Sequence, residues 1–267
     1  MVCCFVQIRI DSQYTGGMKL YKKKIFPFRI DDHCSIAFAF AGHEGNAKMV
    51  IQDSREAIAE MSPAQRTLKA VRQQLRSFVK SVNHDYVCPD HGGFDLIVAL
   101  WLGAHPKARL LATSGSALID VYDYECFGTG SYLGHFLIRP SFDICPMHTE
   151  HALLLAARTL AAAKRHDEGC GGISMFWLLR DDGTFLRSEY NIFAAEMYIA
   201  QAEAVARDLV LNIGNTGIDD TAFEMNCRSV VQMARTIRSN WKGNTPSWQT
   251  LDKLRPALPE EVTEEAL

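Results

Sequence analysis

The sequence contains no long apolar run, no secretory signal and no large excess of charge of one sign. None of its apolar stretches approaches the roughly 18 residues that a membrane-spanning helix needs. Its start lacks the basic segment, apolar run and small-residue cleavage site of a secretory signal. A formal net charge of -3 gives no electrostatic reason to expect a nucleic-acid partner. We therefore expect a cytoplasmic protein that binds neither a membrane nor a nucleic acid.

The sequence also lacks the cysteine spacing of a disulfide framework or a zinc site. Its eight cysteines are scattered along the chain, so most of them are expected to be buried thiols. Cys88, His91 and the nearby His84 carry metal-binding side chains, but no second Cys-x-x-Cys or histidine pair stands at a suitable spacing. We therefore expect a loop at 88–91, with no metal and no cofactor.

The composition is that of an ordinary globular protein with a sizeable core. The chain has 267 residues, of which 48% are hydrophobic and 22% charged, and this fits one large domain or one domain with an appendage. Asp-Asp-Gly at 181–183 predicts a hairpin turn. Alternating or continuous apolar residues predict strands at 2–10, 19–28, 35–41, 94–101, 109–113, 119–127, 171–179 and 184–187.

Apolar residues at helical intervals predict helices between these strands. The first runs from Gly42 to Ile58, and Ser-Pro-Ala-Gln at 62–65 carries the cap and first-turn signals of a second helix. Further helices are expected after Gly130 and at 147–165, 194–213 and 220–241. Helices packed on antiparallel sheets explain this order, so the predicted fold class is α+β, with two sheets that face each other.

Three turn segments carry a pattern that goes beyond secondary structure. They are 11–17 (Asp-Ser-Gln-Tyr-Thr-Gly-Gly), 128–131 (Gly-Thr-Gly-Ser) and 167–172 (Asp-Glu-Gly-Cys-Gly-Gly). In this order they resemble Asp-x-Arg-x-Thr-x-Gly, Gly-Ser-Gly-Ser and Asp-x-x-Ser-Gly-Gly in the beta-type subunits of the proteasome family of N-terminal-nucleophile (Ntn) hydrolases. Gln13, Thr129 and Cys170 replace the arginine and the two serines of these patterns.

Three further segments extend the resemblance. Lys24-Ile25 is similar to the family's Lys-Ile pair, Ala41-Gly42 to its Ala-Gly at the first helix, and 92–95 (Gly-Gly-Phe-Asp) to its Gly-Gly-x-Asp. Each motif alone is weak, and the resemblance rests on the ordered series, which covers roughly Val2 to Arg187.

The resemblance implies a fold and a division of the chain. The implied fold is a four-layer αββα sandwich of two antiparallel sheets flanked by helices, with extra C-terminal helices. Residues 1–189 would form the Ntn-hydrolase domain, with its first strand missing. Residues 190–241 would form a helical extension and 242–267 a flexible tail.

The resemblance also implies a threonine-type peptidase or amide-hydrolase scaffold that acts on a peptide or small amide and assembles as a homo-oligomer. In such a site the α-amine of the nucleophile is its base, and a buried lysine lowers the proton affinity of both groups. The implied catalytic residues are Asp11, Lys24, Thr129, Asp167 and Cys170. Backbone groups of Gly42, Gly128 and Gly130 would bind the substrate or the oxyanion, and Phe40 would shape the specificity pocket.

No residue of the sequence fits the nucleophile. Cys3 lies on the predicted strand that leads to Asp11, and eight residues of strand separate the two by about 26 Å. We therefore expect a hydrolase scaffold whose nucleophile is absent from the chain as written and lies on an upstream strand. The alternative is a non-catalytic subunit that acts in ring assembly or partner binding.

Each motif also has a purely structural interpretation. Asp11 and the residues after it are typical of a strand-to-turn junction, and 22–24 is a lysine run that is solvated except for one inward side chain. Residues 167–172 are typical of a helix end with a glycine cap. The order and spacing of the whole series favour the hydrolase interpretation.

Overall fold

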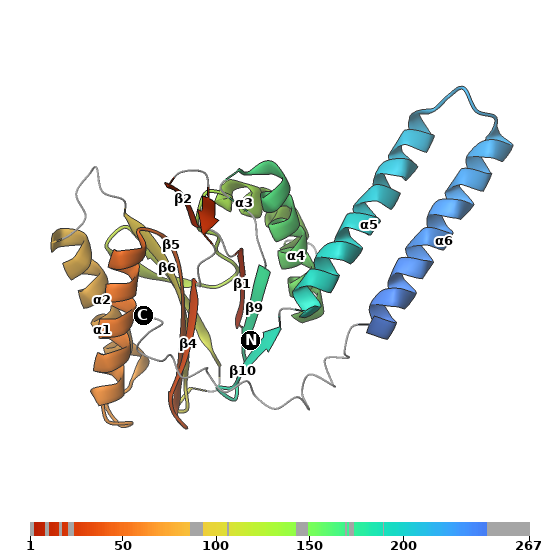
Figure 1. Ribbon diagram of the computed structural model, residues 1–267. Helices are drawn as coiled ribbons and strands as arrows, with labels where there is room; N and C mark the ends of the chain where they lie inside the picture. The colour runs from red at the N-terminus through yellow and green to blue at the C-terminus, as the bar shows by residue number, and fades with distance from the viewer. Residues whose placement is uncertain are drawn as a thin grey trace.

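The structure is a computed structural model with an α+β fold (Figure 1). It describes residues 3–8, 11–15, 18–20, 24–85, 93–105, 107–142, 149–168, 170, 174–188 and 190–244. The predicted α+β class is confirmed, because helices pack against antiparallel strands.

An antiparallel five-stranded sheet forms the centre of the fold. In order across the sheet, its strands are β4 (Ile25–Asp31), β5 (Cys34–Gly42), β6 (Phe94–Leu102), β7 (Arg109–Ser114) and β8 (Ala117–Val121). Nearly every residue of β5 is buried, because other elements cover both faces of the sheet. This explains why its sequence is continuously apolar rather than alternating.

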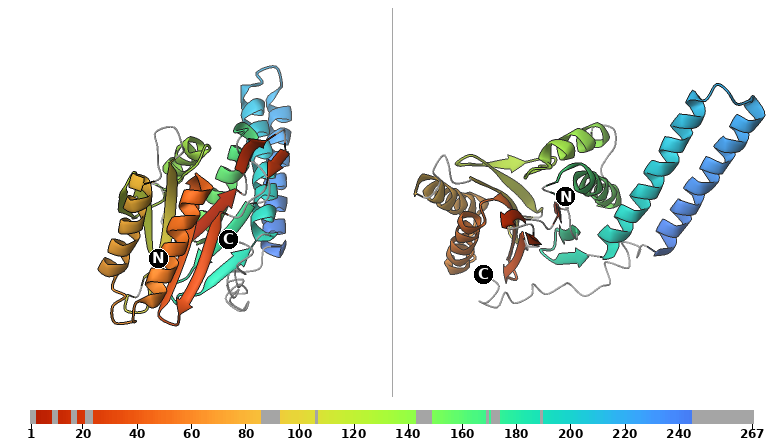
Figure 2. Two further views of the ribbon diagram at one scale, coloured as in Figure 1. Left: turned by 60° about the vertical axis from the view of Figure 1, so that its left-hand side comes forward. Right: turned by 45° about the horizontal axis from the view of Figure 1, so that its top comes forward.

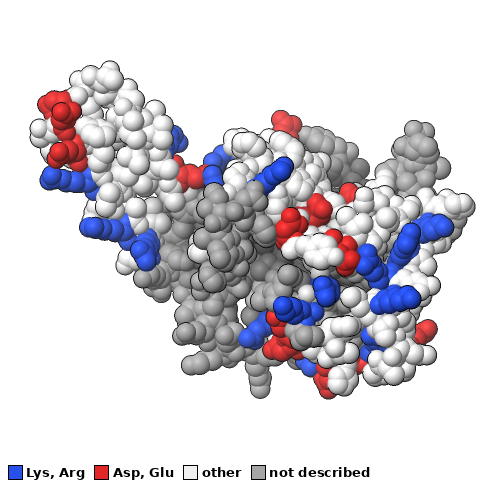
Figure 3. Space-filling view, turned by 180° about the vertical axis from the view of Figure 1, so that it is seen from behind, with Lys and Arg blue, Asp and Glu red and all other residues white. Residues whose placement is uncertain are grey.

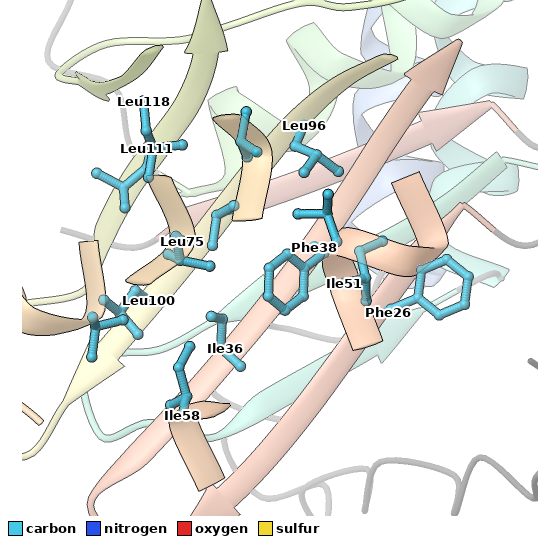
Figure 4. Packing of buried hydrophobic residues seen from close by; sticks show 14 of the residues in the cluster. Phe26, Ile36, Phe38, Ile51, Ile58, Leu75, Leu96, Leu100, Leu111 and Leu118 are labelled. Carbon is cyan, nitrogen blue, oxygen red and sulfur yellow. The ribbon is translucent and has the colours of Figure 1, made fainter. Parts of the chain in front are cut away.

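Helices α1 (Glu44–Glu60) and α2 (Leu68–Asp85) cover one face of this sheet (Figures 1 and 2). Phe38 of β5, Ile51 of α1 and Leu75 of α2 belong to the main hydrophobic core, which lies between the sheet and the two helices (Figure 4). Each of these three side chains is almost completely buried. Burial of a large apolar side chain is worth about 1.5–3 kcal/mol, so this layer provides much of the stability of the fold.

A second apolar cluster lies on the opposite face of the sheet. There the small residues Ala37 and Ala99 of the sheet meet the large residues Trp177, Leu179 and Phe185. These large residues belong to β9 (Ser174–Leu179) and β10 (Phe185–Ser188), which pair with β1 (Cys3–Ile8) in the order β1-β9-β10. Small side chains opposite large ones let the two sets of strands approach closely.

The turn between β9 and β10 is fixed on the five-stranded sheet by hydrogen bonds. Trp101 Nε1 donates to the Asp181 carbonyl oxygen at 2.7 Å, and Ser35 Oγ donates to the Gly183 carbonyl oxygen at 2.6 Å. Gly183 has a φ of 79° and lies against the Trp101 ring, where a β-carbon would collide with the indole. The predicted Asp-Asp-Gly turn is therefore confirmed.

The remaining helices come after the five-stranded sheet in the sequence. They are α3 (Ser131–Phe142), α4 (Thr149–His166), α5 (Tyr190–Gly214) and α6 (Asp220–Asn244). α4 contacts β1, α3 and α5. α5 and α6 form an antiparallel hairpin that projects away from the sheets (Figures 1 and 2). Within the described ranges, none of these helices is apolar enough over a sufficient length to cross a bilayer.

The predicted start of the second helix is wrong. Ser62 does bond to Gln65, since Gln65 Oε1 accepts from both the backbone N–H and the hydroxyl of Ser62 at 3.0 Å. These bonds close an isolated turn, and α2 begins only at Leu68, where Thr67 Oγ1 accepts from the Ala70 N–H at 3.2 Å. A cap pattern predicts a turn of this kind as well as a helix start, because both use the same local bonds.

Two strand predictions near the ends of the sheets also need correction. The expected strand at 19–28 is two separate strands, because β3 (Met18–Leu20) pairs with β2 (Asp11–Thr15) while β4 starts at Ile25. The strand expected at 119–127 is the shorter β8, which ends at Val121. The loop expected at 88–91 lies outside the described residues, as do residues 245–267 of the tail expected at 242–267, whereas α6 continues to Asn244.

Candidate functional site

Lys24 lies at the start of β4, and its side chain lies beside β5. The Phe40 N–H donates to the Lys24 carbonyl oxygen at 3.2 Å, which joins the two strands at this end. The Lys24 ammonium stands 5.8 Å from the centroid of the Phe40 ring, within the range of a cation–π contact. Lys24 is partly buried there. Lys22 and Lys23 lie outside the described residues, so Lys24 is the lysine of this run that the structure places.

The end of β5 turns sharply at Gly42. Gly42 has a φ of 84°, in the left-handed region that favours glycine. The next residue, His43, donates its backbone N–H to the Gly93 carbonyl oxygen at 3.1 Å, and its Nδ1 accepts from the Asn46 N–H at 3.2 Å. His43 therefore caps α1. The predicted motif at Ala41-Gly42 thus marks a strand-to-helix turn held against the start of β6.

The glycine turn before α3 lies next to this strand end. Gly128 has a φ of 95°, and a β-carbon there would stand 3.7 Å from that of Ala41. Its carbonyl oxygen accepts from the Ser131 N–H at 3.0 Å, which starts α3. The turn at 128–130 therefore stands at the positive N-terminal end of a helix, where backbone N–H groups stabilise negative charge.

Cys170 packs against the same turn from the end of α4. Thr129 Oγ1 and Cys170 Sγ are 3.6 Å apart, and the Gly130 backbone also hydrogen-bonds the sulfur. A β-carbon on Gly130 would stand 3.1 Å from this sulfur, so a larger residue here would have to displace the thiol by a few tenths of an ångström. The Cys170 N–H donates to the Asp167 carbonyl oxygen at 2.9 Å. The predicted motifs at 128–131 and 167–170 therefore meet in space.

The electrostatic surroundings of Cys170 connect it to two more predicted residues. Burial raises the pKa of the thiol, and the Asp167 carboxylate raises it further. The hydrogen bonds from Thr129 and Gly130 and the positive charge of Lys24 lower the pKa, and the net shift is upward. Cys170 is therefore a neutral thiol at neutral pH, on which a cation and an anion have opposite effects.

The carboxylates that border the site were missed at the sequence level. Asp95 pairs with Ala41 across the sheet, and burial, then the charge of Glu125, raises its pKa. Glu125 Oε1 is 3.4 Å from His135 Nε2, and the His135 ring contacts Tyr124. Asp95 belongs to the motif at 92–95, but the sequence analysis assigned it no role. No spacing in the sequence indicates that Glu125 or His135 lies near Asp95.

The structure describes less of the other predicted residues, Asp11 and Cys3. Asp11 begins β2, where it pairs with Leu20, but its side chain lies outside the described part and its role stays a prediction. Cys3 pairs with Leu179 at one end of β9, whereas Cys170 precedes Ser174 at the other end. The five residue steps along β9 from Ser174 to Leu179 span about 17 Å. Cys3 is therefore far from the thiol of Cys170 and does not fit the nucleophile of a site built there.

The opposing charges around Cys170 lead to a testable expectation. Replacing Asp167 with asparagine should lower the pKa of the Cys170 thiol, because it removes an anion, and Lys24→Met should raise it, because it removes a cation. Alkylation of each cysteine, followed over pH by mass spectrometry, measures these pKa values. Cys126, whose pKa burial raises to about 12, serves as an unreactive internal reference.

Glu168→Gln is the matched control, because Glu168 is an exposed carboxylate next to Asp167 that does not affect the pKa of Cys170. Equal alkylation profiles for Asp167→Asn and Glu168→Gln would contradict the proximity of Asp167 to the thiol.

Comparison with known proteins gives no match at the level of sequence and a clear one at the level of fold. No protein-family profile and no curated protein matches the chain. Anbu (ancestral beta-subunit) from Yersinia bercovieri superposes with a TM-score of 0.61 at 14% identity, covering 79% of this chain and 92% of that one.

Two more structures agree. A helical assembly of the Anbu complex from Pseudomonas aeruginosa gives a TM-score of 0.63 at 14% identity, covering 78% of this chain and 90% of that one. An Anbu (Gly-1) mutant from Hyphomicrobium sp. strain MC1 gives 0.61 at 12% identity, with coverage of 76% and 90%. The chain therefore shares its fold with Anbu proteins, which are proteasome-like.

These matches correct the family that the motifs indicated. The sequence pattern predicted a proteasome beta-type subunit, whereas the matching structures are Anbu proteins, which are distinct from it.

Proposed function

We propose that the protein has the scaffold of an Ntn amide hydrolase, with a site at the junction of β5, α3 and the end of α4. The observation that carries this proposal is the convergence of three segments distant in sequence. Lys24, the turn at 128–130, Asp167 and Cys170 meet around one sulfur atom. The fold shared with Anbu, a proteasome-like beta-subunit, supports the same class.

We extend this proposal to the layers and the division of the chain. β1, β9 and β10 are the second sheet of a four-layer αββα sandwich, in which α1 and α2 form one outer layer and α3 and α4 the other. Residues 1–189 form the hydrolase domain, and 190–241 the helical extension. The second apolar cluster between the two sets of strands supports this arrangement.

Each group has a defined part in the proposed reaction. A hydroxyl or thiol nucleophile gives its proton to its own α-amine, and the proton then passes to the leaving amine of the substrate. The Lys24 ammonium lowers the proton affinity of that amine. The backbone N–H groups at 128–130 stabilise the oxyanion that develops on the substrate carbonyl, and Thr129, Asp167 and Cys170 hold the turn in place.

The proposed reaction requires a nucleophile that carries a free α-amine. Cys3 and Cys170 do not fit this role, since the first is distant and the second carries a raised pKa. The test is to read the DNA upstream of Met1 and to produce the protein extended by the in-frame codons. An in-frame strand with Thr, Ser or Cys at a processing point supports the proposal, and a stop codon directly upstream contradicts it.

Hydrolysis of fluorogenic peptide amides by this extended protein tests the site. Lys24→Ala should lower its kcat/KM by about 100-fold or more, as expected for loss of the group that tunes the base. Lys80→Ala, on the exposed surface of α2, is the matched control and should leave the rate unchanged. Hydrolysis that persists in Lys24→Ala would exclude the proposed site.

A non-catalytic subunit in a homo-oligomer is the second candidate. The projecting α5–α6 hairpin favours it, because a helical pair that extends beyond the body offers surface for assembly. The structure from Pseudomonas aeruginosa is described as a helical assembly. A defined oligomer by light scattering, without hydrolysis by the extended protein, would select this candidate over the enzyme.

A further inference from the structure

The α5–α6 hairpin is joined to the body through α5. Glu196 of α5 accepts hydrogen bonds from Lys164 Nζ at 2.8 and 2.9 Å and a hydrogen bond from Ser174 Oγ. Arg158 and Arg165 of α4 both contact Glu203 of α5. α6 packs on α5 and is the outer helix of the pair (Figures 1 and 2). The outer side of α6 is therefore the part of the hairpin farthest from the sheets.

An exposed stripe of side chains runs along α6. Its members are three or four residues apart, so they share one face of the helix. The members of the α6 stripe are Asp220, Glu224, Arg228, Val231, Arg235 and Arg238, and all of them are exposed.

Charge is ordered along the α6 stripe. Both carboxylates lie in its N-terminal part, near the tip of the hairpin, and the three arginines follow toward the base. Figure 3 shows acidic side chains gathered at the end of the hairpin and basic side chains below them. Val231, 49% exposed, is the apolar member and stands among the arginines.

We infer that the α6 stripe packs against the same stripe of a second copy of this chain, with the two helices antiparallel. A two-fold axis near Ser229 places opposite charges together. Glu224 lies five residues before Ser229 and Arg235 six after it, while Asp220 and Arg238 lie nine residues before and after it. With a rise of about 1.5 Å per residue, both carboxylates come within about one residue of an arginine of the other copy.

The central residues fit the same arrangement. Arg228 lies one residue before the axis and Val231 two after it, so the aliphatic part of Arg228 covers Val231 of the other copy. The charge of Arg228 is already balanced, because Glu224 Oε2 is 3.2 Å from its Nη2. A parallel arrangement would instead set carboxylates against carboxylates and arginines against arginines, which is destabilising.

The contact rests on the proposed self-assembly and identifies its surface, but it does not depend on hydrolysis. Exposed ion pairs contribute little each and are screened by salt, so a weak, salt-sensitive dimer is expected. The competing interpretation is an ordinary solvated helix face, in which Glu224 and Arg228 stabilise only their own helix.

Reciprocal charge reversal separates the two interpretations. In the dimer of Glu224→Arg the new guanidinium faces Arg235 of the other copy, and in the dimer of Arg235→Glu the new carboxylate faces Glu224. Each single variant should therefore lose self-association by at least about tenfold in Kd. An equimolar mixture of the two variants can form a heterodimer. In it, one facing pair is the native Glu224 with Arg235, and the other is the same pair with its two charges exchanged. Both pairs are attractive, so association should return to the wild-type level. Sedimentation velocity of the full chain, at protein concentrations up to about 100 µM and at about 0.05 M and 0.5 M salt, measures this.

Asp208→Arg is the matched control, because Asp208 is an exposed charge on α5 of the same hairpin and lies outside the α6 stripe. It should associate like the wild type. The inference is overturned by a wild type that stays monomeric at low salt, by single variants that associate normally, or by a mixture that does not recover. Circular dichroism confirms that each variant keeps its helices. Loss of hydrolysis in the extended protein, with association intact, would affect only the enzyme proposal.

Discussion

Replacement of Gly42 by alanine is expected to lower the free energy of unfolding by about 4 kcal/mol. Gly42 has a φ of 84°, which an L-residue with a β-carbon adopts only with strain. A β-carbon there would also come closer than 3.0 Å to the Gly93 carbonyl oxygen and would stand 3.0 Å from the Phe94 α-carbon. Both neighbours are backbone of β6 and its approach, so they cannot rotate away. Urea unfolding followed by tryptophan fluorescence measures the loss.

Gly115→Ala is the matched control for this substitution. Gly115 has a φ of 58°, but no heavy atom lies within 4 Å of the point where its β-carbon would stand. The strain of the backbone alone should therefore cost about 1 kcal/mol. Similar losses for the two variants would show that the close approach of Gly42 to β6 contributes nothing. Because Gly42 also lies beside Ala41 and the turn at 128–130, Gly42→Ala should raise the rate of Cys170 alkylation as well.

Arg66→Met is expected to lower the free energy of unfolding by about 3 kcal/mol. The Arg66 side chain is 7% exposed and pairs with Asp31. Its Nε donates to the Ile58 carbonyl oxygen at 2.9 Å and its Nη2 to the Ala59 carbonyl oxygen at 3.1 Å. These two oxygens belong to the last turn of α1, where carbonyl groups have no partner within the helix. Methionine keeps the apolar volume and removes every one of these bonds.

The control for Arg66→Met is Arg72→Met. Arg72 pairs with Asp120 at 2.5 Å, but its side chain is 37% exposed. A partly solvated ion pair contributes at most about 1 kcal/mol. The two losses should therefore differ by about 2 kcal/mol in urea titrations. Equal losses would indicate that the bonds from Arg66 to α1 are dispensable.

The ion pair between Arg66 and Asp31 predicts that the stability of the fold depends on pH in acid. Burial raises the pKa of Asp31, but the hydrogen bond from Arg66 and that from the His33 N–H lower it more, so the pKa lies below its ordinary value of 3.8. Asp31 therefore stabilises the fold above pH 3.8, and this contribution is lost as the pH falls through the lower, folded pKa. Asp31→Asn should reduce the loss of stability with acid over this range. An unchanged acid transition in Asp31→Asn would contradict the pair.

The sequence indicated most of the central sheet because burial leaves a strong local signal there. β5 is apolar throughout since both of its faces are covered, and the apolar spacing of α4 follows from its packing on β1. The start of α2 was misplaced because Ser62 and Gln65 form the expected local bonds without a helix. The two short strands before Lys24 were merged, since pairing of β2 with β3 leaves no pattern that distinguishes it from one longer strand.

The candidate site was predictable only in part. The order of the motifs placed Lys24, Thr129 and Cys170 in one predicted site, because glycine turns that allow close backbone approach are visible in a sequence. In the structure Thr129 contacts Cys170 and the charge of Lys24 acts on its thiol, while their catalytic roles stay a prediction. Asp95 and Glu125 were not predicted to meet, since their proximity depends on how the loop after β8 folds back over β6. The predicted family was wrong, because the motifs resembled a proteasome beta-type pattern whereas the matching structures are Anbu proteins.

The pairing of β1 with β9 has a consequence during synthesis on the ribosome. Cys3 is opposite Leu179 in this ladder, so the first described strand of the chain finds its partner only near the end of the fold. At about 5–20 residues per second, β1 waits on the order of ten seconds or more before β9 emerges. The five-stranded sheet and its two covering helices are translated in between. β1 therefore stays without its partner strand while the whole five-stranded sheet is made, and an unpaired strand edge of this kind promotes aggregation.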